Sequence, residues 1–385
     1  MVKIGVDTLI EFKHVSKTIG SNVILKDIDL TIESGTLMVL IGPSGCGKTT
    51  TLKMINKLIS PTSGTILIDG KDISKEDTIN LRRGIGYVIQ STGLFPHLTI
   101  KENIELIPKL KKEDKSYICQ KTLDLLNLVG LDPEKYMDKY PRELSGGQQQ
   151  RVGVARAFAT DADIILMDEP FSALDPITRN SLQEELFTLQ QELKKTIIFV
   201  THDMDEAIKL GDKICIMHDG VIAQVDNPEN ILRKPANEFV KNFIGDNRVW
   251  DKPEFIKAMD IMIKDPISIR AQRTIFQGIN IMRSTKVDSL LIVDKEDTLI
   301  GIVTLKDITK QTDRTMMLQD IMEHNVLSIK AEDNLLDILT MMKENSIGYV
   351  PVTDKDGKLV GLVTRSSLIS VLSEQFLETG VTFLE

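Results

Sequence analysis

Glycine, lysine and threonine residues in one short segment are spaced for binding a phosphate. The segment Gly42–Thr49 reads GPSGCGKT, which matches G-x-x-x-x-G-K-[ST], and it lies between the apolar run Leu37–Ile41 and the helical run Thr50–Leu58. Glycines let backbone N–H groups converge on phosphate oxygens, and the following helix N-terminus adds positive charge. In such a loop Lys48 meets the β- and γ-phosphates and Thr49 offers its hydroxyl to Mg²⁺. The predicted phosphate-binding residues are Gly42, Pro43, Ser44, Gly45, Cys46, Gly47, Lys48, Thr49 and Thr50.

Two carboxylates end an apolar run that is typical of a buried strand. Asp168 and Glu169 directly follow Ile164–Met167. Unpaired buried charge is costly, and a divalent cation removes that cost. We therefore expect Asp168 to hold Mg²⁺ through its water and Glu169 to accept a proton from an attacking water molecule. Alone, the pattern also fits an ordinary strand end; beside the phosphate loop it indicates cleavage of a nucleotide phosphate.

A second short segment with a serine and two glycines precedes another expected helix. The segment Leu144–Gln148 reads LSGGQ, and it is another place where a phosphate can meet a helix N-terminus. With this segment the chain resembles the ATPase subunits of ATP-binding-cassette (ABC) transporters. The resemblance implies a head-to-tail homodimer in which the LSGGQ of one chain closes over ATP held by the other, with Ser145 and Gly147 on the γ-phosphate. The residues that it assigns to this contact are Ser145, Gly146, Gly147 and Gln148.

The remaining motifs of ABC ATPases follow in the family's order. The resemblance makes Gln90 the Q-loop glutamine, which can touch Mg²⁺ and the nucleophilic water. It makes Ser172–Asp175 the D-loop, with Asp175 among the nucleotide-binding residues, and His202 the switch histidine. The side chain of His202 can steady charge on the γ-phosphate in the transition state. A lone histidine after a strand is usually structural, so this role depends on the other motifs.

One position departs from the family pattern. ABC ATPases usually stack adenine on an aromatic residue just before a glycine in the first hairpin, and this chain has Ile19–Gly20 there. Ile19 can cover a base by apolar contact but has no π face. The sequence therefore predicts weaker discrimination between ATP and GTP than in relatives with an aromatic residue.

Apolar runs that alternate with amphipathic segments predict an α/β domain over residues 1–246. Its central parallel strands are expected at Leu37–Ile41, Ile164–Met167 and Thr196–Val200. The strand signal fades between Arg82 and Asp138, so we expect a helical subdomain over about 91–160. The predicted fold is a P-loop ABC-type nucleotide-binding domain with a helical subdomain.

The second part of the chain repeats itself. Ile261–Met262 recurs as Ile321–Met322, and Leu299–Thr304 recurs as Leu359–Thr364, so both pairs are 60 positions apart. Each copy reads as strand, helix, strand, turn, strand, helix. The hairpin turns are expected at Asp294–Asp297 and Asp354–Gly357. The duplication resembles an α+β pair of cystathionine-β-synthase-type (CBS) modules. We expect this pair at 247–376, with modules at about 255–310 and 315–374, followed by a C-terminal tail at 377–385.

CBS pairs often bind adenine-containing ligands, and the resemblance implies a regulatory nucleotide here. The first module keeps the family's Thr304 and Asp307, whereas the second has Thr364 with Ser367 in place of the Asp. Arg365 adds a cation that favours a phosphate-rich ligand. Cyclic di-AMP is the first expectation, because a two-fold ligand suits two copies of the pair. Another adenine nucleotide, ionic-strength sensing and dimerisation alone are the alternatives. The predicted ligand residues are Thr304, Asp307, Tyr349, Leu362, Thr364 and Arg365.

Composition and charge limit the partners. Apolar residues make up 42% and charged residues 27% of the chain, which is ordinary for a folded globular protein. The net charge of −9 predicts no nucleic-acid partner. Three distant cysteines without a CxxC pair favour neither a disulfide framework nor a zinc site, and they fit a reducing cytosol. No stretch approaches the roughly 18 apolar residues of a membrane helix, so other chains must span any membrane.

The CBS pair indicates which group of ABC ATPases the chain resembles. An ATPase chain with a CBS pair resembles the subunit that powers a glycine betaine/carnitine/choline-type osmoprotectant importer. This implies membrane-spanning permease subunits, a substrate-binding protein and a peripheral position on the cytoplasmic face of the cell membrane. Gly93–Ile100 resembles the segment that docks on a membrane subunit, through Leu94, Phe95 and Leu98; local packing is the alternative. Other open readings are an importer of another small solute, such as an amino acid, and an ABC switch protein without transport.

Overall fold

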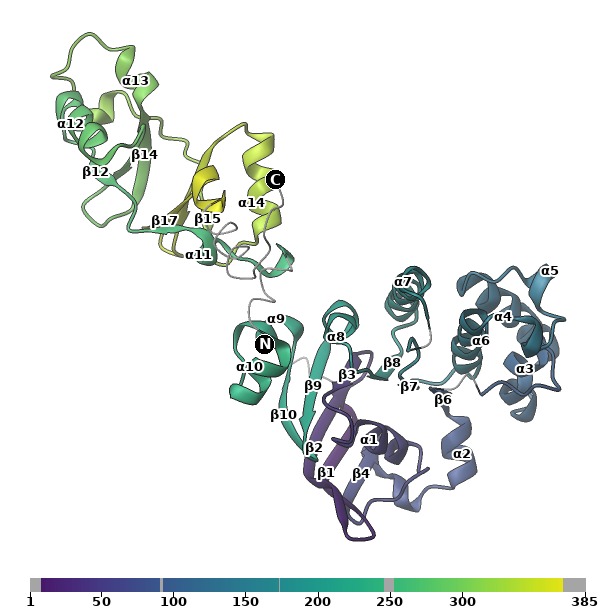
Figure 1. Ribbon diagram of the computed structural model, residues 1–385. Coiled ribbons are helices and arrows are strands. Elements are labelled where there is room, and N and C mark those ends of the chain that lie inside the picture. The colour runs from purple at the N-terminus through teal and green to yellow at the C-terminus, as the bar shows by residue number, and fades with distance from the viewer. Residues whose placement is uncertain (1–7, 91–92, 173, 246–252, 370–385) are drawn as a thin grey trace, which may run out of the picture. The chain divides into compact units, whose positions relative to one another are not determined.

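The computed structural model describes residues 8–90, 93–172, 174–245 and 253–369. The chain divides into two compact units, Met1–Gly245 and Asp246–Glu385 (Figure 1). The expected tail at 377–385 lies outside the described residues, and so does Ala173 of the D-loop segment. None of the described helices is long and apolar enough to cross a membrane.

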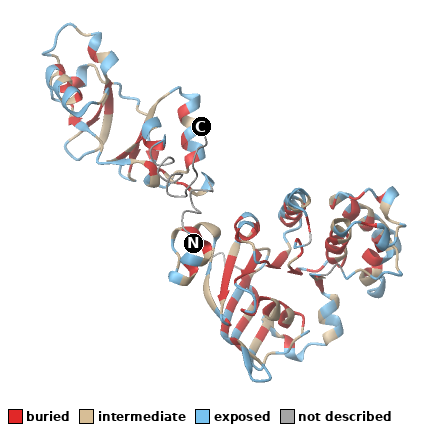
Figure 2. Cartoon of the chain, viewed as in Figure 1, coloured by how far each residue is buried: buried red, intermediate tan, exposed pale blue. Residues whose placement is uncertain are grey.

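A six-stranded sheet forms the centre of the first unit. Its strands lie in the order β10-β9-β3-β8-β7-β6, and only the pair of β10 and β9 is antiparallel. The strands β3, β7 and β8 are buried along their whole length, as their apolar runs predict, and Figure 2 shows buried residues concentrated in the strands of this unit. The strand bounds are β3 Leu37–Ile41, β6 Ile85–Val88, β7 Ile164–Asp168, β8 Thr196–Val200, β9 Lys213–His218 and β10 Val221–Asp226.

A second, antiparallel sheet in this unit has the strand order β2-β1-β4-β5. The alternating burial along β1 and β2 places one face of this sheet in the core that it shares with β3 and β7. The strand bounds are β1 Thr8–Ile19, β2 Asn22–Glu33, β4 Ser63–Ile68 and β5 Lys71–Asp72. The short helices beside the sheet and at the end of the unit are η1 Ile73–Lys75, α2 Thr78–Arg83, α9 Pro228–Arg233 and α10 Glu238–Ile244.

The helix after the phosphate loop differs from the expected run Thr50–Leu58. The helix α1 spans Lys48–Ile55, so it starts two residues earlier than expected, directly after Gly47, whose φ of +108° is a conformation that glycine adopts readily. It ends earlier as well, where Asn56 leaves helical geometry. The loop therefore passes directly into the helix at Lys48, which puts the N–H groups of the first helical turn beside the glycines.

Helices fill the chain between β6 and β7. Figure 1 shows α3 to α6 as a group beside the strands, and contacts of α6 with α3 and α4 hold this group together. The helix bounds are α3 Ile100–Leu110, α4 Lys115–Leu128, α5 Pro133–Tyr136, η2 Pro141–Glu143 and α6 Gly146–Ala159. The core helices that follow β7 and β8 are α7 Pro176–Leu193 and α8 Met204–Leu210. Strand β6 lies where the strand signal of the sequence fades, just before the expected helical subdomain at about 91–160, so the sequence pattern did not reveal this strand.

The second unit contains the duplicated fold. Each copy gives a strand, a helix and an antiparallel hairpin, with the hairpin turns at the two aspartate-rich segments as predicted. The first copy comprises η3 Pro253–Phe255, α11 Ala258–Ile261, β11 Ile263–Lys264, β12 Ser268–Arg270, α12 Ile275–Thr285, β13 Ser289–Val293, β14 Leu299–Thr304 and α13 Leu305–Thr309. The second comprises η4 Leu318–Asp320, β15 Ile329–Lys330, α14 Leu335–Glu344, β16 Tyr349–Thr353, β17 Leu359–Thr364 and helical residues 365–369.

The repeated sequence blocks exchange partners between the copies. A Cβ on Gly301 would lie 2.7 Å from the Sδ of Met322, and a Cβ on Gly361 would lie 2.4 Å from the Sδ of Met262. Each methionine therefore packs on the glycine of the other copy, and only glycine leaves room for it. Strand β11 follows Met262 and pairs with β17 of the second copy. The two recurring sequence blocks thus make equivalent contacts in the two copies.

Candidate active site

The phosphate loop joins the buried strand β3 to α1. Gly42 has φ of +154°, and a Cβ there would lie 2.1 Å from the carbonyl oxygen of Met217. Gly47 has φ of +108°, and a Cβ there would lie 2.4 Å from Leu25 Cδ2. Both positions therefore require glycine for the loop to keep its shape. The loop holds a cradle of backbone N–H groups at a helix N-terminus, which suits an anion.

Lys48 turns back over this loop. Its side chain is only 7% exposed, and its Nζ donates hydrogen bonds to the carbonyl oxygens of Gly42 at 2.7 Å and Pro43 at 3.0 Å. The ammonium group thus lies at the loop. Cys46 is buried in the same loop, and burial is the main cause that raises the pKa of its thiol. A thiol in this state packs in the loop and is a weak nucleophile.

Two of the three predicted metal ligands, Thr49 on α1 and Asp168 on β7, are in contact, whereas the third, Gln90, contacts Glu169. Thr49 Oγ1 donates a hydrogen bond of 2.8 Å to Asp168 Oδ1 at the carboxyl end of the strand. Asp168 is buried, and this burial is the main cause that raises the pKa of its carboxyl group. A hydroxyl and a carboxylate are hard oxygen ligands of the kind that Mg²⁺ prefers. The donor set therefore fits this ion.

The three predicted catalytic residues also come together. Gln90 Nε2 donates to Glu169 Oε2 at 3.1 Å, and His202 Nδ1 lies 3.5 Å from the same oxygen. Glu169 adopts φ of +46°, a left-handed conformation that is uncommon for a residue with a Cβ and that concentrates at functional sites. Its N–H donates to Val200 O at 3.0 Å, which helps to hold this turn. Gln90 and His202, which are far apart in the sequence, thus both contact the carboxylate of Glu169.

A network behind His202 was missed by sequence reasoning. Buried Glu206 accepts a hydrogen bond from Thr201 Oγ1 at 2.6 Å and another from Gln183 Nε2 at 3.3 Å, and Arg179 Nε lies 3.9 Å from its Oε1. Burial is the main cause that raises the pKa of Glu206. This network connects the turn that contains His202 with α7 and α8 and so holds the turn in place. A glutamate four positions after the histidine, on the apolar side of a short helix, was the available signal.

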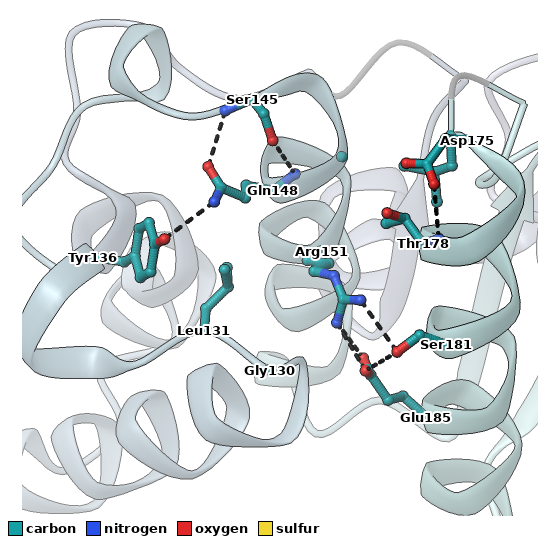
Figure 3. Close-up of a pocket in the computed structure, with 12 residues that line it drawn as sticks. Gly130, Leu131, Tyr136, Ser145, Gln148, Arg151, Asp175, Thr178, Ser181 and Glu185 are labelled. Atoms are coloured by element: carbon teal, nitrogen blue, oxygen red, sulfur yellow. Dashed lines mark hydrogen bonds and ion pairs between the residues drawn. The ribbon is translucent and has the colours of Figure 1, made fainter.

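The LSGGQ segment forms a separate cleft (Figure 3). Ser145 caps α6: its Oγ accepts from the N–H of Gln148 at 3.3 Å, and Gln148 Oε1 accepts from the N–H of Ser145 at 3.0 Å. Residues of α7 and its cap form the other wall, including Asp175, which accepts from the N–H of Thr178 at 3.1 Å. The cleft has a volume of about 550 Å³. The structure brings Ser145, Gly147, Gln148 and Asp175 to this cleft, whose lining includes no phosphate-loop residue.

Ile19 ends β1 in the first hairpin, where it pairs with Asn22. Its side chain is 54% exposed. An apolar side chain with this much exposed surface has room to cover a base.

The second unit holds a cleft of about 710 Å³ between its two copies. Tyr349, Leu362, Thr364 and Arg365 line it, and Tyr349 pairs with Thr364 in the sheet. Thr304 and Asp307 do not line this cleft. They cap α13 instead, where Thr304 Oγ1 donates to Asp307 Oδ2 at 2.6 Å. The first copy contributes residues that sequence reasoning missed, namely Ile263, Pro266, Ile267, Lys286, Val287, Asp288, Ser289, Leu291 and Leu305.

The first unit has the features of a P-loop nucleoside triphosphatase, and comparisons with known proteins identify its family. Residues 25–172 match the family described as ABC transporter, and residues 258–312 and 318–374 match the CBS domain. The chain is 50% identical over 366 residues to the carnitine transport ATP-binding protein OpuCA of Listeria monocytogenes serotype 1/2a (strain 10403S), over 94% of this chain and 92% of that protein.

Two further relatives agree. The chain is 48% identical to the glycine betaine/carnitine/choline transport ATP-binding protein OpuCA of Bacillus subtilis (strain 168), over 94% of this chain and 96% of that protein. A solved dimeric ATP-binding cassette, MJ0796, in a post-hydrolysis state bound to ADP and Pi, is 36% identical with a TM-score of 0.53, over 57% of this chain and 99% of that chain. The chain belongs to the ABC transporter ATP-binding proteins and carries a C-terminal pair of CBS domains. The predicted family, fold class and ATPase activity with ATP and Mg²⁺ are thereby confirmed.

Proposed function

We propose that the chain hydrolyses ATP to power an importer of quaternary-amine solutes such as glycine betaine, carnitine or choline. The catalytic part rests on one observation: Gln90 and His202 both contact the carboxylate of Glu169. Glu169 directly follows Asp168, which is hydrogen-bonded to Thr49. The transport proteins named for carnitine and for glycine betaine/carnitine/choline support the solute class.

The side chains divide the work of hydrolysis. Backbone N–H groups of the loop and the ammonium of Lys48 bind the triphosphate. Thr49, Asp168 and Gln90 would hold Mg²⁺, which would neutralise negative charge on the phosphates. Glu169 accepts the proton of the attacking water, and its contact with Gln90 keeps the carboxylate in place. His202 stabilises the charge that develops on the γ-phosphate.

Two copies of the chain build each complete site in this proposal. Ser145, Gly146, Gly147 and Gln148 of one copy cover the ATP that the loop of the other copy holds, and Asp175 lies beside them. The separation of the LSGGQ cleft from the phosphate loop within one chain supports this arrangement. The helix N-terminus behind Ser145 presents free N–H groups and positive charge to the γ-phosphate of the neighbour.

Membrane subunits dock beside the Q-loop in this proposal, and a substrate-binding protein delivers the solute. An apolar groove of about 320 Å³ supports the docking place, because Phe95 lines it and is 43% exposed. Leu106 and Ile107 of α3 line the same groove, whereas Leu94 and Leu98 are half-buried. An exposed aromatic residue beside an apolar groove is typical of an interface. The chain then lies peripherally at the cytoplasmic face of the membrane.

Uptake measurements test the proposed solute. A strain that lacks the gene, complemented with the full chain or with the Glu169→Gln variant, is given radiolabelled glycine betaine, carnitine, choline and an amino acid. We expect uptake of at least one quaternary amine with the full chain and none with the variant. Uptake of the amino acid alone would identify the other importer class, and failure to co-purify with a membrane permease would refute a transport role.

A nucleotide that binds the CBS cleft regulates the importer in this proposal, and cyclic di-AMP is the proposed ligand. Tyr349 offers an aromatic face, and the guanidinium of Arg365, in an exposed residue, offers hydrogen bonds to a phosphate. Lys286 adds a second cation from the first copy. Thr304 and Asp307 occupy in the first copy the positions of Thr364 and Ser367, and they remain proposed nucleotide contacts although they do not line this cleft.

Replacing Arg365 and Tyr349 together by alanine is expected to lower the affinity for cyclic di-AMP by at least about 100-fold. The double variant loses a charge-assisted hydrogen bond, about 1.5–3 kcal/mol, and a stacking contact of about 1 kcal/mol. Calorimetry on the full chain measures this loss, with Lys355→Ala on the hairpin turn as the control. Absence of binding by the unaltered chain would remove cyclic di-AMP and leave ionic-strength sensing or dimerisation.

Introducing a ring at Ile19 is expected to sharpen base selection. In Ile19→Tyr the preference for ATP over GTP should rise about 2- to 10-fold, because aromatic stacking contributes about 0.5–1.5 kcal/mol beyond apolar contact. Competition titrations of the two nucleotides on the full chain measure the ratio. Ile79→Tyr, on the exposed side of α2, is the control, and an unchanged ratio in Ile19→Tyr would contradict the role of this position.

A further inference from the structure

An ion pair joins the helix that carries the LSGGQ segment to a helix of the ATPase core. Arg151 Nη1, on α6, lies 2.8 Å from Glu185 Oε1 and 2.6 Å from Glu185 Oε2, on α7. Ser181 Oγ donates to Glu185 Oε1 at 3.0 Å and holds the carboxylate in place. Figure 3 shows this contact across the cleft from Tyr136. The arginine and glutamate side chains are only 13% and 27% exposed, so solvent screens the pair less than a surface pair.

The chain makes room for this guanidinium. Arg151 Nη1 also donates to the carbonyl oxygen of Val129 at 2.7 Å, at the end of α4. Gly130 follows with φ of +67°, and a Cβ there would lie 3.0 Å from Arg151 Nη1. A side chain at this position would press on the guanidinium and adopt a strained backbone. Arg151 therefore ties three places together: α6, the end of α4 and α7.

The ion pair of Arg151 and Glu185, called the clamp below, is joined to the LSGGQ segment by the helix α6. Arg151 lies six residues after Ser145, so both belong to the first two turns of α6 or its cap. A rotation of α6 relative to α7 would therefore move the hydroxyl of Ser145 and the free N–H groups at the helix N-terminus. The phosphate loop of the same chain contacts neither Arg151 nor Glu185 among the hydrogen bonds and ion pairs of the described residues.

We propose that Arg151 and Glu185 are positioning residues that fix the angle at which α6 presents the LSGGQ segment to ATP bound by the other copy. This inference rests on the proposed head-to-tail dimer. It assigns the pair an effect on hydrolysis in the neighbour's site and none on ATP binding by the chain that carries it. A contact that merely stabilised the fold would act on the chain's own site.

Mixed dimers of the full chain separate these possibilities. Glu185→Gln keeps the size of the side chain and removes its charge, and Glu184→Gln, an exposed neighbour on the same helix, is the matched control. In one mixture Glu185→Gln is placed on the chain that also carries Lys48→Ala, opposite an unaltered chain. In the other mixture Glu185→Gln and Lys48→Ala are on opposite chains. Nucleotide binding and thermal unfolding of each variant accompany the hydrolysis rates.

We expect hydrolysis to fall about tenfold in the first mixture and to stay within about twofold of the Glu184→Gln control in the second. Arg151→Lys, which keeps the charge but loses the planar fork, should behave like Glu185→Gln. Equal rates in both mixtures, or a defect that follows the chain's own site, overturn the clamp. Ser145→Arg in the same two mixtures tests the dimer itself. If Ser145→Arg impairs hydrolysis in the site of its own chain, the head-to-tail arrangement is wrong. If Ser145→Arg impairs the neighbour's site and Glu185→Gln does not, only the clamp is rejected.

Discussion

Glu169→Gln is expected to slow ATP hydrolysis by about 10²- to 10³-fold while ATP still binds, because removal of a general base costs this much in rate. The amide retains the size of the carboxylate and can still contact Gln90 and His202, so the cradle of the phosphate loop keeps its shape. With hydrolysis blocked, ATP holds the two copies together. The closed dimer should therefore accumulate.

Phosphate release and gel filtration with ATP measure the two effects on the full chain. Glu192→Gln, an exposed glutamate on α7, controls for the loss of one charge. Turnover in Glu169→Gln within about threefold of the unaltered chain would show that another group accepts the proton. A slow variant that remains monomeric with ATP would separate the proton acceptor from closure of the dimer.

Lys48→Ala is expected to lower the affinity for ATP by about 10- to 100-fold, since a hydrogen bond from a charged donor contributes about 1.5–3 kcal/mol. Hydrolysis should fall further than affinity, because charge on the γ-phosphate grows in the transition state. The lysine is buried, and carbonyl oxygens of its own loop accept its hydrogen bonds, so the ammonium lies at the phosphate site before ATP arrives.

Fluorescent nucleotide titration measures the affinity of Lys48→Ala, and thermal unfolding shows whether the loop survives. Lys71→Ala, an exposed lysine on β5, is the control. Full affinity in a folded Lys48→Ala protein would mean that the backbone N–H groups alone bind the triphosphate, and the assigned role of the lysine would be wrong.

The elements that the sequence predicts well have strong local patterns. The strands β3 and β8 coincide with their apolar runs, because strands buried on both faces carry continuous apolar residues. Strand β6 was missed, since it is four residues long and contains Gly86, which weakens the strand signal. The start of α1 also differed, because the left-handed conformation of Gly47 is a backbone property that the motif alone does not place.

The functional residues also divide into those that a local sequence pattern predicts and those that depend on packing between distant elements. The residues Gln90, Glu169 and His202 were predicted from motifs, and in the structure Gln90 and His202 both contact the carboxylate of Glu169. Glu206 and Arg151 were missed, because their partners lie on other helices and only the packing of those helices makes the contacts. In the second unit, the resemblance predicted Thr304 as a ligand residue, but its hydroxyl caps α13 and it does not line the cleft that Tyr349 lines.

The central claim is that each ATP is hydrolysed between two copies of the chain, and complementation between two inactive variants tests it most directly. Lys48→Ala removes the phosphate-binding lysine, and Ser145→Arg blocks the LSGGQ segment. Mixed in one dimer, these variants leave one site with an intact loop and an intact LSGGQ only if the two parts come from different chains. The account predicts that hydrolysis, absent in each variant alone, returns on mixing; a mixture as inactive as its components would contradict it.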